Sequence, residues 1–202
     1  MFQTDIRYHL LMSEPGRSRA GFVLVGGRSS RMGQDKALLE FQGSTLAARI
    51  AECVRGVAGN VTLIGPPDRY RDLGYTVIPD RAADCGPLGG VYTALLASRA
   101  EWNLMIACDM PLVTGPLLEE LFATAESGAS TVDCIVPVTA ESALDPLCAV
   151  YHRRCARAAQ QAIERNIFKM HDFVSSLRLL KHAIADSAPL ANINTPTEWS
   201  RL

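Results

Sequence analysis

Five short apolar runs recur along the chain, and longer segments with a helical spacing of apolar positions separate them. The runs are almost continuously apolar and do not alternate with polar residues, which is typical of parallel strands covered on both faces. Alternating strands and helices predict right-handed crossovers and a doubly wound, mostly parallel, open α/β sheet. The predicted strands cover residues 21–25, 60–65, 75–79, 102–108 and 133–138.

The segments between these runs have the pattern of amphipathic helices. In residues 45–58, Leu46, Ile50 and Val54 fall on one helical face, whereas Arg49 falls on the other. Similar patterns predict helices over residues 88–99, 116–127 and 153–165.

Domain organisation follows from the length of the chain and from its two ends. A chain of 202 residues suits one domain with a sizeable core. Residues 1–18 contain scattered charges and an EPGRSR segment typical of a linker, so we expect a loosely attached extension before a single domain over residues 19–202. Two further apolar segments, 147–152 and 177–184, are expected to add strands at an edge of the sheet, and an antiparallel direction is open for both.

Composition and charge exclude several classes of protein. With 48% hydrophobic and 20% charged residues, the chain has an ordinary globular composition. Its formal net charge of −1 argues against nucleic acid or an anionic membrane surface as the main partner. No apolar run approaches the ~20 residues that a membrane-spanning helix needs. The six cysteines show no CxxC spacing and lie mostly in apolar segments, which predicts reduced thiols in a cytoplasmic protein.

Candidate chemistry follows the predicted strands, because ligands of open α/β sheets bind beyond the carboxyl ends of the strands. After the first strand comes GGRSSRMGQDK, in which Gly26 and Gly27 let backbone N–H groups approach an anion closely. Arg28, Arg31 and Lys36 add positive charge around them. The segment is a candidate phosphate cradle, although a solvated strand-to-helix turn with incidental basic residues stays an open alternative.

The spacing in this segment differs from two familiar phosphate-binding motifs. A Walker A loop needs Gly-Lys-Ser/Thr in direct succession, whereas Gln34 and Asp35 separate Gly33 from Lys36. A dinucleotide fingerprint needs GxGxxG and an acidic residue at the end of the second strand, and this chain has neither. The pattern therefore argues against an NAD-dependent oxidoreductase.

Two later strands are followed by carboxylates. Asp80 follows the third strand and precedes a glycine-containing helix start, with Gly89 and Gly90, that could accept a phosphate or the edge of a base. Asp109 follows the fourth strand directly, in CDMP, where one carboxylate and phosphate oxygens together would hold Mg²⁺. The alternatives are that the Asp80 segment is only a capped helix entry and that Asp109 caps the next turn.

The segment NINTPTEW near the C-terminus has a helix-start pattern. Thr195 is a natural N-cap, Pro196 fits the first helical position, and Glu198 completes a capping box. This pattern does not explain Asn192 and Asn194, whose amides could face a ligand or a metal.

Together these segments resemble the molybdenum cofactor guanylyltransferases, a branch of the larger nucleotidyltransferase family. The resemblance implies a Rossmann-like nucleotidyltransferase fold and an enzyme that transfers GMP from GTP to the terminal phosphate of molybdopterin, releasing pyrophosphate. The first segment and CDMP are typical of the wider family, and NINTP is typical of the guanylyltransferase branch. The matching pieces run in the family's order from about residue 21 to the end: LVGGRSSRMGQDKALL, DCGPLGGV, CDMP, DPLCAVY and NINTPTEW.

The resemblance also implies roles for individual residues. Lys36, Arg31 and Asp109 would be catalytic. Asp109 would hold Mg²⁺, with Asn194 as a further metal or cofactor contact. The nucleotide contacts are expected from Leu24, Val25, Gly26, Gly27, Lys36, Asp80, Gly89 and Asp109.

Two positions depart from the family pattern. Val25 stands where alanine is usual, which could crowd the pocket for the base. Ile64 stands where some members have an asparagine that contacts the nucleotide, so that contact must be absent or replaced.

Other functions stay open on the sequence. The nearest is a cytidylyltransferase acting on the same pterin, or a sugar-nucleotide enzyme of the same fold. A non-catalytic nucleotide-binding protein is a second alternative, against which the intact Lys36 and Asp109 argue. For the favoured function the partners are GTP and molybdopterin, and the resemblance implies transient docking to proteins that donate and receive the cofactor.

Overall fold

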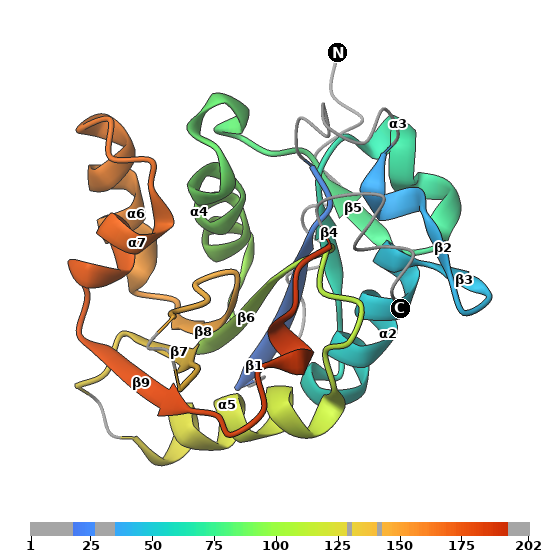
Figure 1. Cartoon of the computed structure of the whole chain (residues 1–202). Helices are drawn as coiled ribbons and strands as arrows, with labels where there is room; N and C mark the ends of the chain where they lie inside the picture. Colours follow the sequence, from blue (N-terminus) through green and yellow to red (C-terminus); the bar gives the residue numbers. More distant parts are fainter. Residues whose placement is uncertain (1–17, 27–34, 129–130, 141–142, 194–202) are drawn as a thin grey trace.

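A seven-stranded sheet crosses the molecule in this computed structural model, which describes residues 18–26, 35–128, 131–140 and 143–193 (Figure 1). Its strands are β1 (Arg19–Leu24), β4 (Thr62–Ile64), β5 (Thr76–Ile78), β6 (Trp102–Ala107), β7 (Cys134–Val138), β8 (Cys148–His152) and β9 (Leu179–Ala183). The α-helices are α2 (Leu46–Ala58), α3 (Pro67–Tyr70), α4 (Pro87–Ala97), α5 (Gly115–Ser127), α6 (Cys155–Glu164) and α7 (Met170–Ser175). Within the described residues, no helix combines the length and the apolar character that crossing a bilayer requires.

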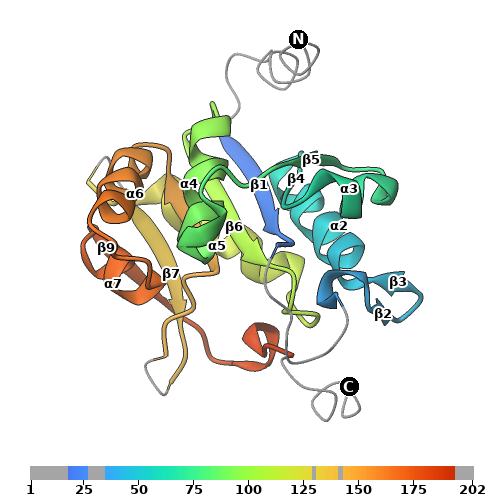
Figure 2. The ribbon, with the colours of Figure 1, turned by 90° about the horizontal axis from the view of Figure 1, so that it is seen from above.

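The helices form two layers, one on each face of the sheet (Figure 2). Buried residues of α2 and α5 share one apolar cluster with the sheet, and those of α4, α6 and α7 share the other. An apolar core therefore lies on both faces, as the nearly continuous apolar strands predicted.

The order of the strands is β5-β4-β1-β6-β8-β7-β9. All five predicted strands are present, and β1, β4, β5, β6 and β7 run in the same direction. The prediction of a doubly wound, mostly parallel open sheet is therefore confirmed.

Strand β8 corrects one expectation, because residues 147–152 were expected at an edge of the sheet. It lies inside the sheet, antiparallel to both β6 and β7. An antiparallel bridge pairs Val138, at the end of β7, with Leu144. The chain therefore returns along β7 as a hairpin, in which the two strands are antiparallel. Strand β9 does lie at an edge, but it is parallel to its neighbour β7.

Helix α2 shows how local sequence signals set the bounds of a predicted helix. The side chain of Thr45 accepts a hydrogen bond from the Ala48 amide at 3.2 Å and so caps the first turn. Gly59 ends the helix in a left-handed conformation, with φ of 70°. Between these caps, Ile50 and Val54 are fully buried against the sheet.

The short elements of the fold were not predicted. They are the hairpin of β2 (Glu40–Phe41) and β3 (Ser44–Thr45), the helices α3 and α7, and the 3-10 helices η1 (Lys36–Leu38), η2 (Arg71–Leu73), η3 (Ala83–Cys85) and η4 (Ala188–Leu190). Segments of two to six residues contain too few positions for a hydrophobic period to be visible.

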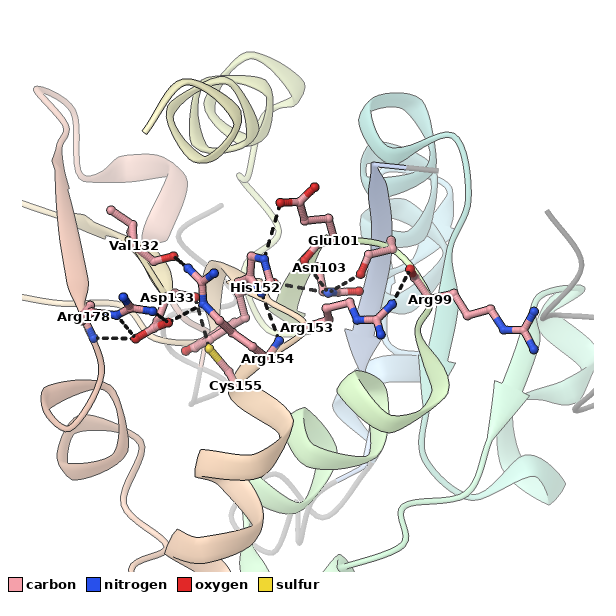
Figure 3. A network of polar contacts seen from close by, with 12 residues as sticks. Arg99, Glu101, Asn103, Val132, Asp133, His152, Arg153, Arg154, Cys155 and Arg178 are labelled. Carbon is pink, nitrogen blue, oxygen red and sulfur yellow. Dashed lines mark hydrogen bonds and ion pairs between the residues drawn. The ribbon is translucent and has the colours of Figure 1, made fainter. Parts of the chain in front are cut away.

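A polar network ties the edge strand β9 to the sheet at the end where β7 begins (Figure 3). Asp133 stands just before β7 and accepts hydrogen bonds from Arg178 at 2.7 and 2.9 Å and from the Arg154 Nε at 2.7 Å. The two guanidinium groups, Arg178 foremost, hold the pKa of the Asp133 carboxyl well below its usual range. The network thus joins the segment before β9 and the start of α6 to β7.

We expect Asp133→Asn to lower the free energy of unfolding by about 1–3 kcal/mol near neutral pH, because two arginines lose an ionised acceptor. A carboxyl whose pKa is depressed by folding stabilises the native state above its unfolded pKa of about 3.9, and this contribution is lost as the pH falls below it. The difference between the two proteins should therefore shrink below about pH 4 in chemical denaturation. Asp72→Asn, at a side chain that is 95% exposed, is the control and should match the parent. Equal stability of Asp133→Asn and the parent at pH 7 would contradict this account.

Candidate functional site

The carboxyl ends of β1, β4, β5 and β6 open into a cavity of about 940 Å³. Backbone hydrogen bonds continue the pairing past the ends of the strands, from the Val25 amide to the Ile64 carbonyl (3.0 Å) and from the Cys108 amide to the Leu24 carbonyl (3.2 Å). The ends of β1, β4 and β6 are thereby held level, and the residues after them face the cavity. The size suits a ligand as large as a nucleotide.

Lys36 and Asp109 meet in this cavity although different segments carry them. Lys36 begins η1, and Asp109 lies two residues beyond the end of β6. The Lys36 Nζ lies 3.9 Å from the Asp109 Oδ2, and the two side chains are 16% and 24% exposed. Burial raises the pKa of Asp109, and the ammonium of Lys36 acts in the opposite direction. A cation placed at this carboxylate would favour its ionised form.

Asp80 stands at a different wall of the cavity, two residues beyond β5. Its Oδ1 accepts hydrogen bonds from the Ala82 amide at 2.8 Å and from the Thr93 hydroxyl of α4 at 3.0 Å. These bonds fix the orientation of the carboxylate. Because both use Oδ1, the other oxygen keeps its capacity to accept from a ligand.

The glycines at the start of α4 have different surroundings. Gly90 lines the cavity, and a Cβ there would lie 3.0 Å from the Leu24 Cδ2. Gly89 packs against the preceding loop, where a Cβ would lie 2.0 Å from the Ala82 carbonyl oxygen. Gly89 therefore allows a close backbone approach that orients the loop of Asp80, whereas Gly90 borders the cavity.

Val25 and Ile64 occupy the positions that depart from the family pattern, and both border the cavity. Their side chains are only 3% and 2% exposed, because both pack in the apolar core. A Cβ on Gly65 would lie 2.9 Å from the Val25 Cγ2, so the end of β1 and the turn after β4 approach each other closely. Little of either residue is therefore open to a ligand.

Six of the residues predicted for the site border this one cavity: Leu24, Val25, Gly26, Lys36, Asp80 and Asp109. Gly27, Arg28, Arg31 and Asn194 lie outside the described residues. Ile193, which precedes Asn194, donates its amide hydrogen to the Asp109 carbonyl at 2.9 Å. Ile193 of the segment that the sequence singled out therefore lies beside Asp109.

The sequence interpretation assigned no role to several acidic side chains that the structure brings to this region. Asp35 and Asp84 border the cavity, and Asp145 lies close enough to Asp109 for their charges to interact. Burial raises the pKa of Asp145 to about 6, and the negative charge of Asp109 adds to this rise. Asp145 belongs to DPLCAVY, a segment noted for its resemblance to the family, but nothing in its spacing distinguishes this carboxylate from a turn residue.

A family model described as the MobA-like NTP transferase domain matches residues 21–182. A probable molybdenum cofactor guanylyltransferase from Flavobacterium johnsoniae is 35% identical over 185 residues, covering 90% of this chain and 94% of the relative. A relative of the same description from Pelotomaculum thermopropionicum is 34% identical and covers 88% of each chain. The crystal structure of molybdopterin-guanine dinucleotide biosynthesis protein A from Archaeoglobus fulgidus is similar with a TM-score of 0.77, at 23% identity and with 91% and 95% of the two chains covered.

We expect Gly89→Ala to lower the free energy of unfolding by about 1–3 kcal/mol, since the new methyl group would lie 2.0 Å from the Ala82 carbonyl oxygen and the backbone would have to shift. The matched control is Gly56→Ala in the exposed part of α2, where a Cβ meets nothing within 4 Å. That variant should be as stable as the parent or more stable by up to about 1 kcal/mol, because alanine favours a helix. Urea denaturation measures the free energy of unfolding of both variants. Equal values would contradict the close approach of the Ala82 carbonyl to Gly89.

Proposed function

The chain belongs to the MobA-like NTP transferase family, and from that premise we propose that it transfers GMP from GTP to the terminal phosphate of molybdopterin. It is a nucleotidyltransferase, and its relatives are named for guanylyl transfer to the molybdenum cofactor. The observation that carries the proposal is the approach of Lys36 to Asp109 within 3.9 Å, in a cavity large enough for a nucleotide.

The proposed reaction makes modest demands on the protein. A phosphate oxygen of molybdopterin forms a bond to the α-phosphorus of GTP, and the bond from that phosphorus to the bridging oxygen breaks. Pyrophosphate leaves with the electron pair of the broken bond. Because the attacking phosphate is already anionic near neutral pH, the protein must position two anions and offset their charge, and it needs no strong general base.

Lys36 supplies this charge from η1. Its side chain is only 16% exposed, so water screens its charge less than it screens that of a surface lysine. In the proposed complex Lys36 contacts phosphate oxygens whose negative charge grows as the bond to pyrophosphate breaks. The backbone amides of Gly26 and Gly27, together with Arg31, are assigned to this cradle from the sequence alone.

The resemblance implies a divalent metal, and we propose Mg²⁺ at Asp109. A hard carboxylate oxygen at the end of a rigid strand suits this ion, which commonly takes one or two carboxylates together with phosphate oxygens. No cluster of three or more candidate ligand side chains exists among the described residues, so substrate phosphates would complete the coordination. Bound Mg²⁺ would neutralise negative charge on the phosphates. Asn194 is the further contact assigned from the sequence.

Asp80 is the proposed acceptor for the base. Its orientation is fixed by Thr93 and the Ala82 amide, and it faces the cavity from a wall apart from the Lys36 and Asp109 pair. Guanine presents neighbouring N–H donors that a carboxylate can bind, whereas cytosine presents one amino group. The guanylyl assignment rests on the family relatives, and cytidylyl transfer is the alternative that a direct comparison of nucleotides decides.

The remaining assignments follow from the same proposal. GTP and molybdopterin are the proposed small-molecule partners, with transient docking to proteins that donate and receive the cofactor. A cytoplasmic location agrees with six cysteines that are all unpaired thiols, three of them buried.

Isothermal titration with GTP, CTP and ATP, each with and without Mg²⁺, tests the function. We expect GTP to bind most tightly and Mg²⁺ to strengthen its binding. Asp109→Asn should lose the strengthening by Mg²⁺ while its circular dichroism stays that of the parent. A preference for CTP would move the function to cytidylyl transfer, and binding of no nucleotide would contradict the proposal.

Lys36→Ala should slow GMP transfer by about 10- to 1000-fold, the range expected when a charge that stabilises the transition state is lost. Release of pyrophosphate from GTP in the presence of molybdopterin measures the rate. Lys181→Ala removes an exposed lysine from the edge strand β9 and should leave the rate unchanged. An unaltered rate in Lys36→Ala would remove this lysine from the mechanism.

A further inference from the structure

Tyr70 is a buried tyrosine whose hydroxyl lies among backbone and carboxylate acceptors. It is the last residue of α3 and is 1% exposed. Its hydroxyl oxygen lies 2.5 Å from the Val25 carbonyl oxygen and 2.7 Å from the Asp35 Oδ2. The single O–H is therefore shared between two acceptors, in a three-centre arrangement that joins three separate segments of the chain.

The two acceptors stand on either side of the glycine-rich segment that the sequence identified. Val25 directly follows β1, where its amide is bonded to the Ile64 carbonyl at 3.0 Å. Asp35 is the N-cap of η1, and its Oδ1 accepts from the Ala37 amide at 3.1 Å. Lys36 is the next residue after Asp35. One hydroxyl thus connects the end of the central strand to the cap of the helix that carries Lys36.

Burial keeps the Tyr70 hydroxyl protonated. Desolvation, with Asp35 as the next cause, raises the pKa of the Tyr70 hydroxyl well above its usual range. The group therefore remains an O–H donor at any physiological pH. A buried hydrogen bond to an ionised acceptor is stronger than one between neutral groups, because little water competes for either partner.

We propose that Tyr70 is a positioning residue that sets the place of Lys36 in the cavity by holding Asp35 against the end of β1. The inference rests on the proposed function, in which Lys36 contacts the phosphates. Tyr70 itself does not line the cavity, whereas Val25, Asp35 and Lys36 do. Its effect on the reaction must therefore pass through the two residues that it holds, Val25 and Asp35, and Asp35 connects it to η1 and Lys36.

The other groups around Asp35 cannot replace this contact. Arg69 lies 3.8 Å from the Asp35 Oδ2, but its side chain is 63% exposed, so this ion pair is weak. The bond from the Ala37 amide is local and holds the turn together without fixing it to the sheet. Among the described residues, Tyr70 makes the hydrogen bond that links the Asp35 carboxylate to the central strand.

The first test is Tyr70→Phe, which keeps the ring and removes only the hydroxyl. We expect the kcat of GMP transfer to fall about tenfold, with a smaller change in the KM for GTP, since Lys36 acts mainly in the transition state. Tyr75→Phe is the matched control, because it removes a hydroxyl that lies 2.5 Å from the Glu52 Oε1 on the outer side of α2. Its kcat should equal that of the parent.

A double-mutant cycle separates positioning from general damage to the fold. If Tyr70 acts through Lys36, Tyr70→Phe should have almost no further effect on kcat in the Lys36→Ala background. Asp35→Ala, which keeps the tyrosine and the core intact, should reproduce the loss seen in Tyr70→Phe. An equal fold-loss in both backgrounds would overturn the proposal.

Amide hydrogen exchange gives a readout that does not require catalysis. Loss of the Tyr70 hydroxyl should speed exchange of the Ala37 amide on the order of tenfold, because its acceptor Asp35 is no longer held. The Ala48 amide, capped by Thr45 in α2, is the internal control and should be unchanged. Unchanged exchange at Ala37 overturns the proposal even if the parent protein transfers GMP. If the parent transfers none, the proposed function fails, and the exchange result still decides whether Tyr70 holds η1.

Discussion

The pairing of β1 with β4 on one side and β6 on the other is the constraint on which the site depends. Its register is fixed along the whole strand, with Leu24 opposite both Ile64 and Ala107. A slip by one residue would turn every buried side chain of β1 to the other face of the sheet, so the alternative registers are strongly disfavoured. The residues after the strands inherit this register. The Val25 and Cys108 amides make backbone hydrogen bonds that continue the strand pairing, so both residues leave the sheet at the same level.

Much of the fold could be predicted because its signals are long and repeated. The continuous apolar runs predicted β1, β4, β5, β6 and β7, and the helical period predicted α2, α4, α5 and α6. The interior place of β8 could not be predicted, because an apolar segment of five residues says that a strand is buried but not which strands lie beside it. That place is set by pairing across a distance in sequence, between residues such as Trp102 and His152.

The site shows the same division between local signals and spatial ones. Asp80 and Asp109 could be singled out because each follows an apolar strand, and in a sheet of this kind such positions converge. Which of the glycines Gly89 and Gly90 borders the cavity depends on the rotational phase of α4, which the sequence does not reveal. Tyr70 carried no signal at all, since a single tyrosine in a four-residue helix has no period and no motif.

Charge balance explains why the proposed chemistry would depend on a metal. Among the described residues that border the cavity, acidic side chains outnumber basic ones: Asp35, Asp80, Asp84 and Asp109 face only Lys36 and Arg69. A nucleoside triphosphate is strongly anionic, so this wall would repel it if every carboxylate were left uncompensated. Tyr70 holds the Asp35 carboxylate, and Thr93 and the Ala82 amide hold the Asp80 carboxylate. A divalent cation bound at Asp109, as proposed, would convert the carboxylate beside Lys36 into part of a positive site. In the proposed reaction, metal dependence would arise from the need to bring two anions together, and the transfer would require neither a strong base nor a nucleophilic side chain.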